Sequence, residues 1–295
     1  MRYSTGVICV IAAGTLWSLM GLALRQIDGA SVWAILFWRS VGMVPVLLAY
    51  ITWSSHGRPI NAIRNIGIAG TIGGLGLVFA FAGAIYAIQS TTIANAVFLF
   101  TASPFVAAIL GWICLREQVR PTTWAAIAMA IVGMFIMVRE GLAIGAMQGN
   151  IAALLSAAGF GAFSVALRWG KLSDMTPAIL LGGLFSIIAA AVILTLQGQP
   201  IIVSPHDMIL SMAIGAIILA TGLSLYTLGS RVIPAADLTL ISMVEVMLAP
   251  IWVWLLLNET ASLNTFIGGA ILLIAVAFNA LSGARQRGLR PVDIP

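Results

Sequence analysis

Long apolar runs cover almost the whole sequence and constrain the fold more than any other feature. Of the 295 residues, 61% are hydrophobic and only 8% are charged, whereas soluble proteins carry about 25% charged residues. A mean hydropathy of +1.09 means that most of the molecular surface can face hydrocarbon. The composition therefore excludes a soluble fold and predicts an all-α integral membrane protein.

Ten of these runs are long enough to cross a bilayer as a helix, which takes about 17 to 25 mostly apolar residues. Short polar breaks separate them, and no stretch is left over for a soluble domain. The first run follows Arg2 but is too long for the apolar region of a signal peptide, so we interpret it as a helix. The predicted spans are residues 5–24, 32–53, 66–88, 92–115, 122–138, 149–169, 176–196, 208–229, 235–257 and 262–283.

The basic residues are divided unequally between the two sides that ten spans define. Both termini and every even-numbered loop share one side with eleven basic residues, while the other side holds only Arg25 and Arg139. Because Lys and Arg collect in cytoplasmic loops, we expect both termini in the cytoplasm and a multi-pass protein of the inner (plasma) membrane. The eleven are Arg2, Arg58, Arg64, Arg116, Arg120, Arg168, Lys171, Arg231, Arg285, Arg287 and Arg290.

The net charge of +5 is explained by this topology without a polyanionic partner. The basic residues stand singly between apolar runs and form no basic stripe, so nucleic acid is not an expected partner. Both cysteines, Cys9 and Cys114, fall inside apolar runs, and neither a disulfide nor a metal site is expected. We expect a monomer in the lipid bilayer that binds a small-molecule substrate and no cofactor.

Four short matches between the two halves of the sequence indicate an internal duplication. Each match alone is weak, but four in chain order at offsets of 141 to 144 residues are hard to obtain otherwise. We therefore predict two five-helix repeats, residues 1–140 and 141–295, the second with a short basic C-terminal tail. The matches pair 23–25 (ALR) with 166–168 (ALR), 34–36 (AIL) with 178–180 (AIL), 57–60 (GRPI) with 198–201 (GQPI), and 112–117 (WICLRE) with 254–259 (WLLLNE).

Because each repeat has an odd number of spans, the second must enter the membrane from the opposite side. Two such halves, related by a pseudo-twofold axis in the membrane plane, can exchange roles and open a central site to either side in turn. The inverted layout therefore favours a transporter. Glycines gather in the third predicted span, at Gly70, Gly73 and Gly74 among others, where they fit either static close packing or helix sliding.

Several motifs resemble those of a known family. The chain resembles the EamA-type permeases of the drug/metabolite transporter superfamily in its inverted layout and in three sequence motifs. These motifs are Phe37-Trp38-Arg39 in the second span, Ser103-Pro104 in the fourth, and the glutamates Glu117 and Glu259 that end the Trp-to-Glu matches. The resemblance covers essentially the whole chain and implies export of amino acids, other small metabolites or drugs.

One departure from the family lies in the ninth span. Glu245-Val246 stands where many members resemble Glu-Pro, and proline comes later, at Pro250. This moves the expected kink by about one turn.

Two ions lie deep inside predicted spans and are the first candidates for a substrate site. A charge at the bilayer centre costs about 2.5 to 3.5 kcal/mol on insertion scales. Arg39 lies near the middle of the second span and Glu245 at the middle of the ninth, at similar depth. They either form a permanent salt bridge or face a shared polar cavity, where Arg39 would attract a carboxylate and Glu245 an ammonium group. The second arrangement suits a zwitterion.

Aromatic and hydroxyl side chains complete the predicted site. Trp17-Ser18 in the first span matches Phe160-Gly161 in the sixth, and we expect the two spans to face each other near mid-depth, where rings stack on a substrate or merely pack. Hydroxyl side chains in such helices also commonly bond their own backbone. Glu117 and Glu259 are expected to stabilise the start of spans five and ten instead. The further substrate-binding candidates are Asn95, Ser103, Ser156, Ser164 and Ser224.

The sequence favours a carrier over other functions. An enzyme would need a nucleophile, metal ligands or paired carboxylates at depth, but His56 and His206 lie in loops and no metal-binding helix motif occurs. We therefore expect no catalytic residues. The favoured substrate is an amino acid or related zwitterion. A multidrug or cationic-compound exporter, a channel and a membrane-embedded enzyme remain alternatives.

Overall fold

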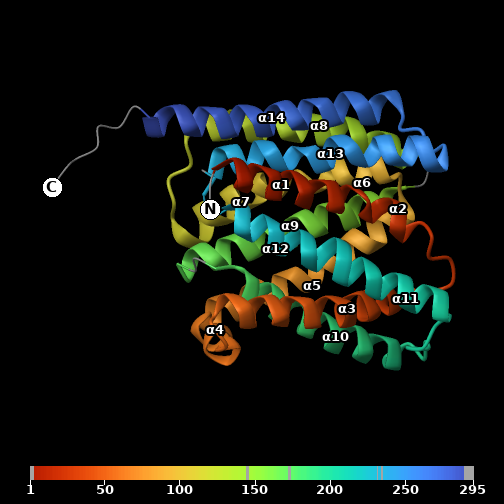
Figure 1. The fold of residues 1–295 in the computed structure, drawn as a ribbon. Helices are drawn as coiled ribbons and strands as arrows, with labels where there is room; N and C mark the ends of the chain where they lie inside the picture. The colour runs from red at the N-terminus through yellow and green to blue at the C-terminus, as the bar shows by residue number, and fades with distance from the viewer. Residues whose placement is uncertain (1–2, 144–145, 172–173, 231, 234, 289–295) are drawn as a thin grey trace.

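The structure, a computed structural model, describes residues 3–143, 146–171, 174–230, 232–233 and 235–288. This part of the chain is helical and contains no strand, and ten helical segments run back and forth along one direction, as predicted (Figure 1). We call the end of the bundle at which the first segment begins and the last one ends the terminal face, and the opposite end the distal face. The predicted C-terminal tail after residue 288 lies outside the described residues.

Seven of the ten segments in the described chain are single helices, and three are interrupted. A short helix, α4 (Pro59–Asn65), lies between the second and third segments. The single helices are α3 (Val32–Ser54), α5 (Gly67–Ser90), α8 (Pro121–Ala143), α9 (Met147–Trp169), α10 (Thr176–Leu196), α13 (Ala235–Leu257) and α14 (Leu263–Gly288). The interrupted ones are α1 (Tyr3–Ser18) with α2 (Met20–Leu24), α6 (Ile93–Phe100) with α7 (Ser103–Leu115), and α11 (Pro205–Ala213) with the π-helical η1 (Ile214–Ala220) and α12 (Thr221–Ser230).

Length and hydropathy agree with a membrane bundle. Nine segments of the described chain are long and apolar enough to cross a bilayer by themselves. In the tenth, α13, the shorter stretch Val244–Leu257 is apolar. The exposed surface carries many large apolar side chains, among them Phe79, Phe135 and Leu255. In a bilayer these side chains face lipid.

The interruptions differ from the continuous spans predicted from sequence, and each coincides with a specific backbone feature. Between α6 and α7 the chain turns at Thr101 and Ala102, directly before Ser103-Pro104. Pro104 lies in the first turn of α7, where its missing N–H costs no helical hydrogen bond. Between α1 and α2 the Leu19 N–H donates to the Leu16 carbonyl, a tighter turn than the α-helix makes. The η1 segment places Gly215 directly against the Arg39 carbonyl of α3.

Helix contacts repeat between the two halves, as two inverted repeats require. Helix α5 packs on α9 and α10, and the corresponding segment of the second half, which contains η1, packs on α1 and α3. Likewise α7 contacts α9 as α13 contacts α1. Two further contacts, α3 with α10 and α8 with α14, join equivalent helices of the two halves. The fold is therefore two inverted five-helix units, confirming the predicted fold class.

Glycines allow the central helices to approach closely. A Cβ at Gly76 of α5 would lie 3.1 Å from the Gly159 carbonyl oxygen, and one at Gly83 would lie 2.7 Å from the Ala152 carbonyl oxygen. A Cβ at Gly74 would lie 3.1 Å from the backbone nitrogen of Gly182 on α10. The glycine-rich third span therefore packs against both neighbours with its backbone, which supports the packing interpretation of these residues.

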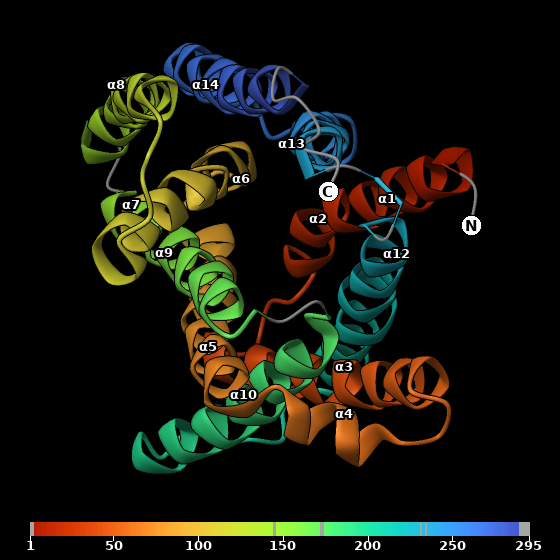
Figure 2. The same cartoon turned by 90° about the vertical axis from the view of Figure 1, so that its left-hand side faces the viewer.

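Seen along the bundle, the helices surround a common axis on which no helix lies (Figure 2). Helices α1 and α2 lie on one side of this axis and α9 on the other, as expected for the first and sixth spans. Helices α3, α10 and α5 close the ring between them on one flank. The side chains on the inner faces of these helices form the candidate site.

Candidate functional site

Arg39 of α3 is buried and has no ion-pair partner among the described residues. Its side chain is only 1% exposed, and its guanidinium carbon lies 4.9 Å from the centre of the Phe81 ring on α5. Nε and Nη2 have no hydrogen-bond partner in the described part of the chain. The ion pairs of the described residues do not include Arg39 or Glu245, so the predicted alternative of a permanent salt bridge between them is not realised in this structure.

Phe81 connects Arg39 to Phe160 of α9. The two phenylalanine rings meet edge to face at a centroid distance of 6.3 Å and an angle of 75°. Phe160 is 36% exposed, and Ser164, one turn further along α9, is exposed as well. Because the outward-facing Ile151 and Leu155 lie on the opposite side of the helix, Phe160 and Ser164 face the central axis.

The α1 residues make contacts within the second half of the protein. The Trp17 ring lies 5.5 Å from that of Tyr226 on α12, and its Nε1 has no partner among the described residues. Ser18 is buried, and its Oγ accepts a 3.0 Å hydrogen bond from the Trp252 indole of α13 while donating to the Thr15 carbonyl. Trp17 Nε1 is therefore a buried donor that packs against Gly222 of α12, whereas Ser18 fixes α1 to α13.

Glu245 lies at the contact between α13 and α1. A Cβ at Gly14 of α1 would be 3.4 Å from the Glu245 backbone nitrogen, so the two helices touch at this level. The residue is partly exposed and has no ion-pair partner in the described chain. It therefore stands across the bundle from Arg39 as a separate acidic group, one turn from the level of Trp17.

Three of the remaining predicted residues form hydrogen bonds within the protein. Asn95 is buried, and its Nδ2 donates to Asn150 Oδ1 and, over 3.2 Å, to Thr91 Oγ1. Ser156 Oγ donates to the Ala80 carbonyl of α5 at 2.7 Å, and Ser224 Oγ donates to the Ala220 carbonyl of its own helix at 2.8 Å. Ser103 is partly buried at the start of α7.

Residue types alone did not reveal several partners of the site. Phe81, Tyr226 and Asn150 each complete a contact with a predicted residue. Phe81 and Tyr226 are aromatic residues in apolar runs, so they carry no signal that separates them from ordinary packing residues. Asn150 is a buried amide in the sixth span, and that polarity is the signal that could have identified it.

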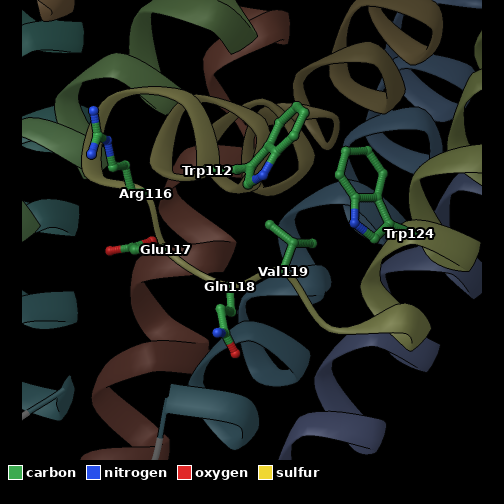
Figure 3. Close-up of a pocket in the computed structure, with 6 residues that line it drawn as sticks. All are labelled: Trp112, Arg116, Glu117, Gln118, Val119 and Trp124. Atoms are coloured by element: carbon green, nitrogen blue, oxygen red, sulfur yellow. The ribbon is translucent and has the colours of Figure 1, made fainter.

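A separate cavity of about 420 Å³ opens at the terminal face, where α7 ends and α8 begins (Figure 3). Trp112 and Trp124 meet edge to face at 5.4 Å beside it, and Glu117 on its wall pairs with Arg168 at 3.1 Å. The other lining residues are Arg116, Gln118 and Val119. This cavity lies at the membrane boundary and not among the deep ions.

The predicted role of Glu259 at the start of the last span is wrong. Its Oε1 accepts a 2.7 Å hydrogen bond from the Ile93 N–H at the start of α6, and its Oε2 lies 3.4 Å from Arg25. The first turn of α14 is capped instead by Ser262, whose Oγ accepts from the Thr265 N–H. Glu259 therefore joins helices of both halves.

Two inverted five-helix repeats around a common axis, with a buried cation that has no ion-pair partner in the described chain, are the arrangement of a membrane transporter. Residues 4–139 and 147–281 each match the sequence profile of the EamA-like transporter family. The chain therefore belongs to this family, and it is a multi-pass membrane transporter of the drug/metabolite transporter type.

Comparison with solved structures agrees on the fold. One protein, titled only "Crystal structure of protein", superimposes with a TM-score of 0.64, covering 97% of this chain and 99% of its own at 17% sequence identity. At this identity the likeness concerns the fold alone. No curated protein matches the sequence.

Proposed function

We propose that the protein exports small carboxylate-bearing metabolites, amino acids or related zwitterions first among them, by alternating access around the central axis. Arg39 carries this proposal. A guanidinium that is 1% exposed, with Nε and Nη2 unpaired in the described chain, is a costly feature that a purely structural core does not need. A carboxylate can accept two parallel hydrogen bonds from a guanidinium and neutralise its charge.

The surroundings of Arg39 support a small, partly apolar substrate. Phe81 covers one side of the guanidinium, and Phe160 extends the aromatic surface to the exposed inner face of α9. A carboxylate at Arg39 would leave the rest of the molecule against these rings. Glu245 on α13 would then provide the acidic group for an ammonium, as a zwitterion requires.

The test is substrate exchange in liposomes that contain the purified protein. A set of radiolabelled amino acids should exchange with saturating kinetics in the parent. Arg39→Gln should abolish exchange of carboxylate-bearing compounds, and Arg39→Lys should weaken it, because a lysine keeps the charge and loses the planar pair of donors. The matched control is Arg64→Gln on the exposed helix α4, which removes one arginine and should leave exchange unchanged. Unchanged exchange in Arg39→Gln would refute the proposal.

A cationic-drug exporter is the second candidate, and one observation favours it. Glu245 has no ion-pair partner in the described chain, and the Trp17–Tyr226 aromatic pair lies on the neighbouring helices α1 and α12. Aromatic faces and a carboxylate are the groups that bind organic cations. If Glu245→Gln abolishes drug efflux while Arg39→Gln does not affect it, this candidate replaces the first. Flux that does not saturate would indicate a channel instead.

A further inference from the structure

Two ion pairs in the structure are related by the internal repeat. Arg25 pairs with Glu259 at 3.4 Å, and Arg168 pairs with Glu117 at 3.1 Å. Arg25 and Arg168 occupy matching positions 143 residues apart, and Glu117 and Glu259 occupy matching positions 142 residues apart. Each pair joins one residue of the first half to one of the second. The pseudo-twofold symmetry that relates the two halves therefore also relates the two ion pairs.

The two pairs lie at opposite faces of the membrane bundle. Arg25 follows α2 and Glu259 follows α13, and both of these helices end at the distal face (Figure 1). Arg168 lies in the last turn of α9 and Glu117 follows α7, and both of these helices end at the terminal face. The distal pair is the more enclosed, with its side chains 28% and 22% exposed against 45% and 38% at the terminal face.

At the distal face a third element holds the pair. Arg25 Nη2 donates a 2.6 Å hydrogen bond to the Thr91 carbonyl, and the Ile93 N–H donates to Glu259. Thr91 lies in the connection between α5 and α6, and Ile93 is the first residue of α6. The distal pair therefore ties together the ends of the first, third, fourth and ninth spans.

Buried amides extend this connection to the sixth span. Thr91 Oγ1 donates to Asn150 Oδ1 at 3.4 Å and accepts from Asn95 Nδ2. Helix α6 itself is buried along nearly its whole length, between α5, α9, α13 and α14. The distal half of the bundle is thus closed both by packing and by polar contacts.

The terminal pair lacks such a third element in the described chain. Arg168 Nη2 donates to the Ala107 carbonyl of α7, the helix that its partner follows. The side-chain contact that joins Thr91 to the sixth span on the distal side also has no counterpart here among the described residues. Ile233 stands where the distal side has Thr91, and Val7 where it has Asn150, and neither side chain can form a hydrogen bond.

The exposure of side chains along the inner side of α9 also differs between the distal and terminal ends of the bundle. Ala153 and Ala157, toward the distal end, are buried. Phe160 and Ser164, toward the terminal end, are exposed. The inner surface is therefore accessible from the terminal side and closed at the distal side.

We propose that Arg25, Thr91, Ile93 and Glu259 form a distal gate that must open when the transporter turns its site to the distal face. The Arg168–Glu117 pair is the repeat-related contact at the terminal face. This inference rests on the proposed alternating-access function. It adds the residues that hold one state, independently of what is transported.

The test measures access to the inner face from each side. Ser164→Cys is placed in a Cys9→Ser/Cys114→Ser background and treated with a membrane-impermeant thiol reagent applied to one face of sealed vesicles at a time. Glu259→Gln should raise the rate of labelling from the distal face about tenfold, the change in equilibrium expected from losing one charge-assisted hydrogen bond. The repeat-related Glu117→Gln is the matched control and should not raise it.

Folding is checked in the same vesicles. Ala126→Cys, fully buried on α8, should stay unlabelled in every variant. If Glu259→Gln also exposes that position, Arg25→Lys provides the test instead. This substitution keeps the charge but weakens the contact to the Thr91 carbonyl, so it should raise distal labelling by a smaller factor. Distal labelling equal to the parent, or raised equally by Glu117→Gln, would overturn the proposal. No substrate is needed, so failure here is distinct from failure of the carboxylate-export proposal.

Discussion

Arg39 shows how much one residue determines the character of the site. The repeat places Gly183 at the equivalent position of the second half, so the scaffold itself does not require a cation there. The cation–π contact with Phe81 contributes about 2 kcal/mol at most in a desolvated setting, whereas burial of an unpaired ion costs several kcal/mol. The net contribution of the buried Arg39 to stability is therefore unfavourable, and we assign its presence to function.

This balance predicts that removing the charge stabilises the protein. We expect Arg39→Met to raise the melting temperature of the detergent-purified protein, because the desolvation penalty disappears and the apolar side chain still fills the space beside Phe81. Arg64→Met on the exposed surface serves as the control and should change little. A lower melting temperature for Arg39→Met would mean that stabilising partners hold the guanidinium.

Arg39 and Glu245 should also be independent of each other in stability. Since they form no ion pair in the structure, the effects of Arg39→Gln and Glu245→Gln on the free energy of unfolding should add to within about 0.5 kcal/mol. A double-mutant cycle measures this. Strong coupling, with recovery in the double variant, would restore the salt-bridge interpretation.

The exposed ring of Phe160 gives a prediction about access. Phe160→Cys should react with a small water-soluble thiol reagent and be protected by substrate, because this position faces the central axis and is 36% exposed. Ala153→Cys lies on the same side of α9 but is fully buried, and it should stay inert. Equal reactivity at the two positions would contradict the described inner surface.

Among the helices, the interrupted segments are where sequence and structure differ most. Uniformly apolar helices show no strong periodicity, so composition locates a span but cannot show which side faces lipid or where the helix breaks. Pro104 signalled the break between α6 and α7, but nothing comparable marks Leu19 or the η1 segment. Those two depend on contacts with helices distant in sequence.

The close approach of η1 to α3 can be tested by a single methyl group. A Cβ at Gly215 would overlap the Arg39 carbonyl, so Gly215→Ala should destabilise the protein by about 1 to 3 kcal/mol as backbone shifts accommodate it. Gly14→Ala is the control, since its Cβ would find only ordinary contacts of 3.4 Å and more. Thermal unfolding in detergent compares the two. Equal melting temperatures would show that η1 can move away from α3.

At the scale of the whole molecule, the duplication was readable from sequence because matching segments keep a constant offset. The location of the spans and their inverted order follow from hydropathy and from the odd number of spans in a repeat. For the candidate site, depth in the span singled out Arg39 and Glu245, whereas predicted hydroxyl residues such as Ser156 and Ser224 donate to backbone carbonyls in the structure. Which polar group faces the axis is decided by helix rotation, and apolar sequence does not encode that visibly.

The charge bias predicts how the molecule sits in the membrane. With eleven basic residues on the terminal side and two on the distal side, a reporter fused after Pro295 should read as cytoplasmic. A reporter inserted at Gly198, in the exposed connection between α10 and α11, should read on the opposite side. If each reporter reads on the side opposite to the expected one, the predicted orientation is wrong. If both reporters read on the same side, the count of ten spans is wrong.

The separation of Arg39 from Glu245 has a consequence for the energetics of the transport cycle. When both groups are ionised, their opposite charges at similar depth sum to zero, and together they contribute no net charge movement when the empty carrier changes state. A bound zwitterion adds none either. The electrical potential across the membrane, worth about 2.3 kcal/mol per charge at 100 mV, therefore exerts no net pull on either half of the cycle. Voltage would neither drive nor oppose such a carrier, and the metabolite's own concentration ratio would set the direction of net movement.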